Sequence, residues 1–166
     1  LFRSVTENII RRSKSLRAAY LNQLEQDRNN LPKREQLSCG NLAHGMAACD
    51  ATDKQQLKIM DSGNMAIITA YNDMLSAHQP YRDYPEQLKL ALRQMGCTGQ
   101  VAGSVPAMCD GVTQGQTGME LSLLSRDLIA QCAAISLSHQ MFDGVLALGI
   151  CDKIVPGLLI GCLAFG

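Results

Sequence analysis

The sequence predicts an α/β fold: a parallel sheet flanked by helices on both faces, a three-layer α/β/α arrangement, preceded by a long N-terminal helix. Two observations support this prediction. Short apolar runs of strand type alternate with helical patterns from residue 64 onward. Before them, a long stretch repeats apolar residues at helical spacing. We therefore expect an N-terminal helical segment over 1–63 that packs on the core, and a parallel α/β domain over 64–166.

The N-terminal helix is predicted over about residues 5–28. Its apolar face comprises Val5, Ile9, Leu16, Tyr20 and Leu24. Ser4 and Glu7 have the spacing of a capping box, and Pro32 follows the expected end. Only short helices are expected between this helix and the sheet, at about 41–48 and 52–60.

From residue 64 the predicted elements alternate regularly. Strands are expected at 65–69, 100–102 and 145–150, and helices from Pro85 to Gly96 and over 119–139. The second helix is expected to bury Leu124, Leu128, Cys132 and Ile135. This order of elements indicates right-handed crossovers and a parallel sheet.

Composition and charge exclude several classes of protein. Lys+Arg 15 against Asp+Glu 15 leaves no net charge, which argues against nucleic-acid binding. Residues 1–36 carry eight Lys/Arg and four Asp/Glu, but the signs interleave at helical spacing. We interpret them as a solvated helix face, with a nucleic-acid arm as the alternative. No apolar run reaches the roughly 18 residues of a membrane span.

The seven cysteines indicate a reducing compartment. Their number is odd, no two have C-x-x-C spacing, and the N-terminus lacks a secretory pattern. A disulfide framework is therefore not expected, and we place the protein in the cytoplasm. Cys132 and Cys162 lie on apolar helical stretches and are interpreted as core thiols.

The apolar segment 157–166 has no polar face. A segment of this kind is buried on all sides. We therefore expect the chain to be a piece of a longer protein, with its α/β domain cut at the C-terminal end.

Residues capable of chemistry gather in the three loops that follow the predicted strands: 71–81, 103–118 and 151–157. Ligands of parallel sheets bind at the carboxyl ends of the strands. In the third loop, Cys151, Asp152 and Lys153 are consecutive. A thiolate suits zinc or an iron–sulfur cluster, and a carboxylate suits Mg²⁺ or Mn²⁺. The alternative is a buried cysteine beside a surface ion pair.

The second loop combines glycines with Asp110 just before a helix. Such glycines either bring backbone N–H groups to an anion or form a tight turn. The loop does not match a Walker motif. Asp110 could meet Asp152 at the strand ends, which would place two carboxylates and a thiolate at one metal site.

A hydroxylated substrate could be bound by polar residues of the first two loops. We expect hydrogen bonds from Asn72, Asp73 and His78, and from Gln114 of the second loop. A surface histidine is the alternative interpretation of His78.

Five stretches resemble the family of dihydroxy-acid and sugar-acid dehydratases. They are Cys39–Gly45, Thr69–Tyr81, Val105–Arg126, Ser138–Gly144 and Cys151–Gly157. The similarity covers nearly the whole chain. Members of the family are several times longer, so this chain resembles their N-terminal part.

The resemblance implies roles for individual residues. Cys151 would bind an iron–sulfur cluster, 4Fe–4S in preference to 2Fe–2S. Asp110, Asp152 and Lys153 would hold a divalent metal, Mg or Mn. Lys153 and Asp152 would be catalytic residues. In the dihydroxy-acid branch, the lysine that matches Lys153 is carboxylated. That branch has another cluster cysteine where this sequence has Ala77, a departure that fits the phosphogluconate branch.

The activity implied by the resemblance is the β-elimination of water from a phosphorylated sugar acid. A cytoplasmic, homodimeric hydro-lyase would convert 6-phospho-D-gluconate to 2-dehydro-3-deoxy-6-phosphogluconate, in the Entner–Doudoroff pathway. A further cluster cysteine and the general base are expected beyond Gly166, so the chain alone should be inactive. The alternatives are a related iron–sulfur dehydratase with another sugar-acid or dihydroxy-acid substrate, and a metal-free α/β interaction domain.

Overall fold

The computed structural model describes residues 2–30 and 33–164, which belong to two compact units. The first unit is helix α1 (Phe2–Asn30), which confirms the predicted N-terminal helix. The predicted capping box is wrong, because the chain is already helical at Phe2 and Ser4 and Glu7 lie within the first turns. Glu7 instead pairs with Arg3 one turn earlier, at 3.1 Å.

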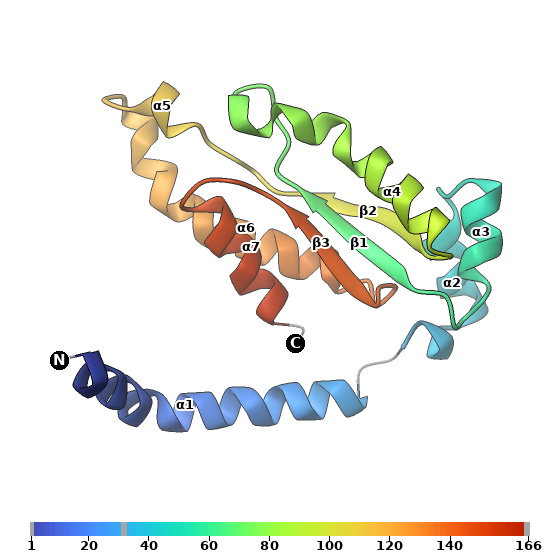
Figure 1. Cartoon of the computed structure of the whole chain (residues 1–166), viewed down its shortest axis with the longest axis horizontal. Helices are drawn as coiled ribbons and strands as arrows, with labels where there is room; N and C mark the ends of the chain where they lie inside the picture. The colour runs from blue at the N-terminus through green and yellow to red at the C-terminus, as the bar shows by residue number, and fades with distance from the viewer. Residues whose placement is uncertain (1, 31–32, 165–166) are drawn as a thin grey trace. The chain divides into compact units, whose positions relative to one another are not determined.

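The second unit is built on a parallel sheet of three strands in the order β2-β1-β3 (Figure 1). The strands are β1 (Asn64–Thr69), β2 (Thr98–Ser104) and β3 (Gly144–Leu148). β1 pairs in parallel with both of its neighbours. The predicted parallel α/β sheet is thereby confirmed.

The position of each strand in the sheet decides its burial. Central β1 is covered on both faces, and Ala66, Ile67 and Ile68 are fully buried. β3 pairs on one side only in the described chain and is mostly half-buried. The strand predicted at 145–150 is therefore present but partly exposed, and it ends at Leu148.

The helices that connect the strands lie on opposite faces of the sheet. α4 (Tyr84–Gln94) joins β1 to β2, and α6 (Ser122–Leu137) joins β2 to β3. These two crossovers run in opposite directions across the sheet, so connections of the same hand place their helices on opposite faces (Figure 1). The final helix α7 (Ile154–Leu163) packs against α6.

Short helices fill the remaining connections. α2 (Cys39–Met46) and α3 (Ala51–Leu57) confirm the short helices expected before the sheet, and η1 (Arg34–Gln36) precedes them. The three loops after the strands also contain helical turns that were not predicted. These are η2 (Ser76–Arg82), α5 (Asp110–Thr113), η3 (Thr117–Leu121) and the start of α7 at Ile154.

The predicted turn over 151–157 is therefore too long. It ends at Lys153, because Pro156 occupies the first turn of α7, where its missing N–H group leaves no hydrogen bond unmade. No helix within the described residues is long and apolar enough to cross a membrane.

The core-facing side of α6 differs from the predicted one. Leu124 and Ile135 of the predicted face are 51% and 67% exposed, whereas Ile129 and Ala133 are fully buried. Apolar residues surround most of this helix, so their spacing alone does not select the buried face. Close packing selects it, because α6 turns its small Ala133 toward Gly161 of α7.

The core of the second unit lies between the sheet and the pair α6–α7. It contains Ala66, Ile68, Ala70, Leu75, Val105, Ile129, Ala133, Leu137, Ile154 and Leu158. Cys132 and Cys162 are partly buried against this core, as expected for core thiols.

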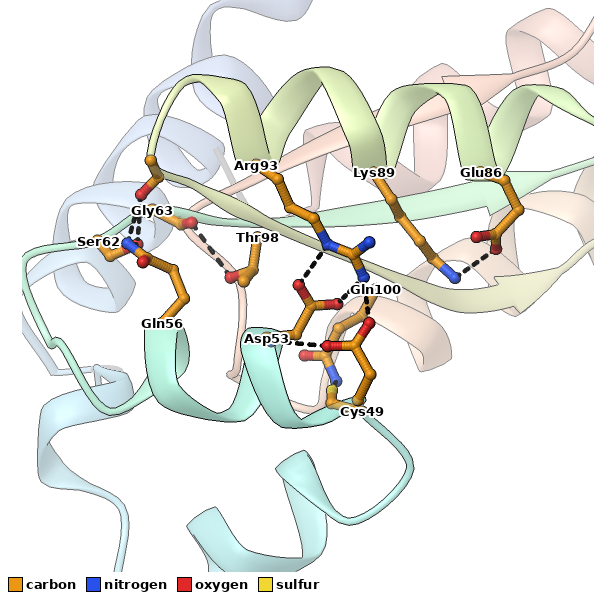
Figure 2. A network of polar contacts seen from close by, with 12 residues as sticks. Cys49, Asp53, Gln56, Ser62, Gly63, Glu86, Lys89, Arg93, Thr98 and Gln100 are labelled. Carbon is orange, nitrogen blue, oxygen red and sulfur yellow. Dashed lines mark hydrogen bonds and ion pairs between the residues drawn. The ribbon is translucent and has the colours of Figure 1, made fainter.

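A polar network fastens α3 to α4 near the amino ends of β1 and β2 (Figure 2). The Arg93 guanidinium donates two hydrogen bonds of 2.7 Å to the buried carboxylate of Asp53 and a third, of 2.5 Å, to Asp50. Gln100 of β2 donates to the Cys49 sulfur at 3.1 Å. These charges border a pocket of about 350 Å³ but are paired with one another, so the network holds helices together.

We predict that Gly161→Ala destabilises the fold. The added Cβ would lie 2.6 Å from both the carbonyl oxygen of Ala130 and the Cβ of Ala133, so α7 must move away from α6. A loss of about 1–3 kcal/mol in the free energy of unfolding is expected from such overpacking, measured by urea denaturation.

Gly40→Ala is the matched control, because its Cβ would meet nothing closer than 3.8 Å in α2. It should leave stability unchanged or raise it by about 0.5–1 kcal/mol. Equal effects of the two substitutions would contradict the close packing of α6 and α7.

Candidate functional site

The loops that leave the three strands surround one pocket at the carboxyl edge of the sheet. Its volume is about 190 Å³, and its wall includes Cys109, Asp110, Cys151, Asp152 and Lys153. Four of these residues were site candidates on sequence grounds. The structure brings all four together, as expected for the carboxyl ends of parallel strands.

Lys153 joins the two acidic loops. Asp110 follows β2 and Asp152 follows β3, and these two strands are separated by β1. The Lys153 ammonium bridges the two side chains: it contacts Asp110 Oδ2 and lies 3.0 Å from Asp152 Oδ1. It thus occupies a position where a divalent cation could balance the same two carboxylates.

The hydrogen bond between Lys153 and Asp110 stabilises the charged form of each. It raises the pKa of Lys153, with a further contribution from Asp152, and lowers the pKa of Asp110. The Asp110 carboxylate is also held by Ser122, whose buried hydroxyl donates a hydrogen bond of 2.9 Å to Oδ1. Asp110 is therefore ionised and fixed in orientation from two sides.

Cys151 has a backbone conformation that favours glycine. Its φ is 81°, in the left-handed region, and the residue is exposed. A side chain in this region costs about 1–2 kcal/mol, and such strain clusters at functional sites. The cysteine at this position is therefore a candidate for a functional role.

The surroundings of Cys151 favour the neutral thiol. Desolvation raises its pKa most, followed by the negative charges of Asp152 and Asp110. A thiol binds iron or zinc as the thiolate, so metal binding at Cys151 must release a proton. A cation in the pocket would oppose the charge of both carboxylates and favour that release.

His78 is fully buried, so the surface interpretation is wrong. Its Nε2 accepts a hydrogen bond of 3.0 Å from the N–H group of Ile150, and its ring lies edge-on to Tyr81. Burial lowers the pKa of His78, which keeps the ring neutral with its proton on Nδ1. Within the described residues, this buried Nδ1 has no hydrogen-bond partner.

The other proposed substrate ligands are placed around the site, and none of them lines the pocket. Asn72 accepts hydrogen bonds from the next turn of its own loop and donates one of 3.2 Å to Ala107. Asp73 is exposed and accepts from Tyr71 at 2.7 Å. Gln114 is exposed after α5. Their contacts with substrate stay a prediction.

The donor atoms in the pocket suit a cluster together with a hard divalent cation. A thiol provides the soft ligand for iron, and two carboxylates provide oxygen ligands for Mg²⁺ or Mn²⁺. Within residues 2–30 and 33–164, no three His, Cys, Asp or Glu side chains gather closely enough for a single ion. A metal ion bound here would need further ligands beside these side chains.

Sequence reasoning missed two residues of this site, Cys109 and Ser122. Cys109 lines the pocket, and Ser122 positions Asp110. The pair Cys-Asp occurs at 49–50, 109–110 and 151–152. The last two pairs lie in loops that follow predicted strands, so for Cys109 a signal was present. No comparable sequence pattern points to Ser122.

Fold and pocket together define an α/β protein with a candidate metal centre at the carboxyl edge of a parallel sheet. The sequence model of one family, described as dihydroxy-acid/6-phosphogluconate dehydratase N-terminal, matches residues 63–166. The chain belongs to this family.

Two similar relatives are phosphogluconate dehydratases. That of Escherichia coli (strain K12) is 63% identical over 162 residues, and that of Pseudomonas aeruginosa is 59% identical over 162 residues. Each alignment covers 98% of this chain and 27% of the relative, so the chain spans about a quarter of their length. The dihydroxy-acid dehydratase of Akkermansia muciniphila is 36% identical over 99 residues, 60% of this chain and 18% of the relative.

We predict that the hydrogen bond from Ile150 to His78 holds the end of β3 in place. His78→Gln can keep an acceptor near the position of Nε2, whereas His78→Met has a similar size without one. The Ile150 amide should exchange its hydrogen faster in His78→Met, with a stability loss of about 1–3 kcal/mol for the unpaired N–H group. Hydrogen exchange measures the difference, and equal rates in both variants would show that the bond does not hold the strand end.

A second prediction concerns the Cys151 thiol in protein freed of metal. Its raised pKa means that less thiolate is present at pH 7 than for a free cysteine, so alkylation by iodoacetamide should be slower. Below the pKa the rate should rise about tenfold per pH unit.

Asp152→Asn removes a negative charge near the thiol and should lower its pKa, moving this rate profile to lower pH. Asp127→Asn, which alters a charge on the exposed surface of α6, is the control. An unchanged profile for Asp152→Asn would contradict the electrostatic coupling.

Proposed function

We propose that the full-length protein is a hydro-lyase that dehydrates 6-phospho-D-gluconate to 2-dehydro-3-deoxy-6-phospho-D-gluconate, a step of the Entner–Doudoroff pathway. The observation that carries this proposal is the pocket in which Cys151, Asp110, Asp152 and Lys153 meet. Similarity to phosphogluconate dehydratases over 98% of the chain favours this substrate over a dihydroxy acid, for which the similarity covers 60%.

The reaction breaks two bonds that are difficult to break in water. The proton next to a carboxylate is weakly acidic, and hydroxide is a poor leaving group. An iron–sulfur cluster bound through Cys151, 4Fe–4S in our proposal, would supply a Lewis-acidic iron for the departing hydroxyl. Asp110 and Asp152 would hold Mg²⁺ or Mn²⁺. This cation would stabilise the negative charge that develops at the carboxylate end of the substrate.

The protein side chains are arranged to keep these ligands in place. Ser122 orients Asp110, and Lys153 ties Asp110 to Asp152. We propose Lys153 and Asp152 as catalytic residues because they reach the pocket from the loop that carries Cys151. If Lys153 is carboxylated, it would become a third oxygen donor beside the two carboxylates.

Several further features belong to the same proposal. Asn72, Asp73, His78 and Gln114 are proposed substrate-binding residues on the loops around the pocket. The resemblance also implies a homodimer and a cytoplasmic location. A helical segment up to residue 63 that packs on an α/β domain completes the proposed organisation.

A metal-free interaction domain is the alternative of a different class. The left-handed backbone at Cys151 favours the enzyme, because a docking surface does not require a strained cysteine at the mouth of a pocket. Iron and sulfide analysis of anaerobically purified full-length protein separates the two. Only the dehydratase requires stoichiometric iron.

We predict that Cys151→Ser in the full-length enzyme abolishes both the visible absorbance of the cluster and the dehydration of 6-phosphogluconate. A serine hydroxyl is not a soft ligand for iron. Cys132→Ser, at a thiol packed against the core, should keep both properties. Normal iron content and full activity in Cys151→Ser would refute the proposed function.

A further inference from the structure

We propose that Cys109 supplies a second thiolate to the iron–sulfur cluster bound at Cys151. This inference rests on the proposed function and extends its ligand set to the loop after β2. Cys109 was not a site candidate from sequence, and the family match does not assign it a role.

The position of Cys109 supports this role. It directly precedes α5 and lines the same pocket as Cys151. Its sulfur lies beside the backbone of Gly111, 3.6 Å from where a Cβ on that glycine would be, and Gly111 also lines the pocket. Because Gly111 has no side chain, the sulfur is not covered from that direction.

The topology explains why these two cysteines line the same pocket. The loops after β2 and β3 leave the same end of the sheet, on either side of β1 (Figure 1). Each loop begins its acidic part with a Cys-Asp pair. The carboxylates of Asp110 and Asp152 are bridged by Lys153, which holds the two pairs together.

The other cysteines do not line this pocket. Cys132 and Cys162 pack against the core, and Cys49 accepts a hydrogen bond from Gln100 in the network beside α3. The loop after β1 has no cysteine between Tyr71 and Asp83. Of the three loops around the pocket, only those after β2 and β3 therefore offer a thiol.

The chemistry of a cluster fits two separated thiols. The thiolates of a 4Fe–4S cluster bind different iron atoms, so they do not need to converge on one point as the ligands of a single ion do. Each thiol loses its proton when its sulfur binds iron, without a change in oxidation state. The carboxylates that flank both sulfurs stay available for the divalent cation.

The first test compares anaerobically purified full-length variants. Cys109→Ser and Cys109→Ala should lose iron to a chelator at least about tenfold faster than the parent protein. Cys132→Ser should match the parent. Iron content and release rates in both Cys109 variants that equal those of the parent would overturn the inference.

The second test uses the unaltered full-length protein and so does not depend on the folding of a variant. Iodoacetamide labelling, read by mass spectrometry, is compared before and after iron removal. Both Cys109 and Cys151 should react at least about tenfold faster once iron is removed. Cys39, an exposed cysteine elsewhere in the chain, should react equally in both states.

The outcomes separate the two proposals. Protection of Cys151 without protection of Cys109 would overturn the role of Cys109 and leave the proposed function intact. Purified protein without iron, in which neither thiol is protected, would overturn the proposed function and the inference with it.

Discussion

Parallel pairing of β1 with both β2 and β3 is the constraint on which the site depends. It carries the ends of three strands, and the loops that follow them, to one edge of the sheet. Cys109, Asp110, Cys151, Asp152 and Lys153 come from two loops about forty residues apart, yet they line one pocket. An antiparallel strand in place of β3 would send the Cys151 loop to the opposite edge.

Hydrogen bonds then fix the positions of the side chains that these loops bring together. Lys153 draws the acidic loops together, Ser122 fixes Asp110, and His78 fastens the backbone just before Cys151. At the amino ends of the strands, the network of Arg93 with Asp53 pairs charge with charge (Figure 2). The two ends of the sheet therefore differ. The amino end has paired charges that stabilise packing, and the carboxyl end exposes a strained cysteine beside carboxylates.

Packing of α6 and α7 shows where sequence patterns are insufficient. Both helices are apolar around most of their circumference, so the spacing of large side chains did not identify the buried face of α6. Steric fit did, because Ala133 and Gly161 allow the two helices to approach closely. His78 is a similar case. A histidine in a polar loop is compatible with exposure or burial, and only the backbone that follows β3, at Ile150, provides its partner.

The sequence by itself determined the α/β class, the order of strands and helices, and the loops that contain the chemistry. These follow from local periodicity and from residue types, which act over a few neighbouring positions. Only the tertiary structure decided which faces are buried, how Lys153 bridges two loops, and that Cys109 joins Cys151 at the pocket. Those features depend on contacts between residues distant in sequence, and such contacts exist only after the strands have paired.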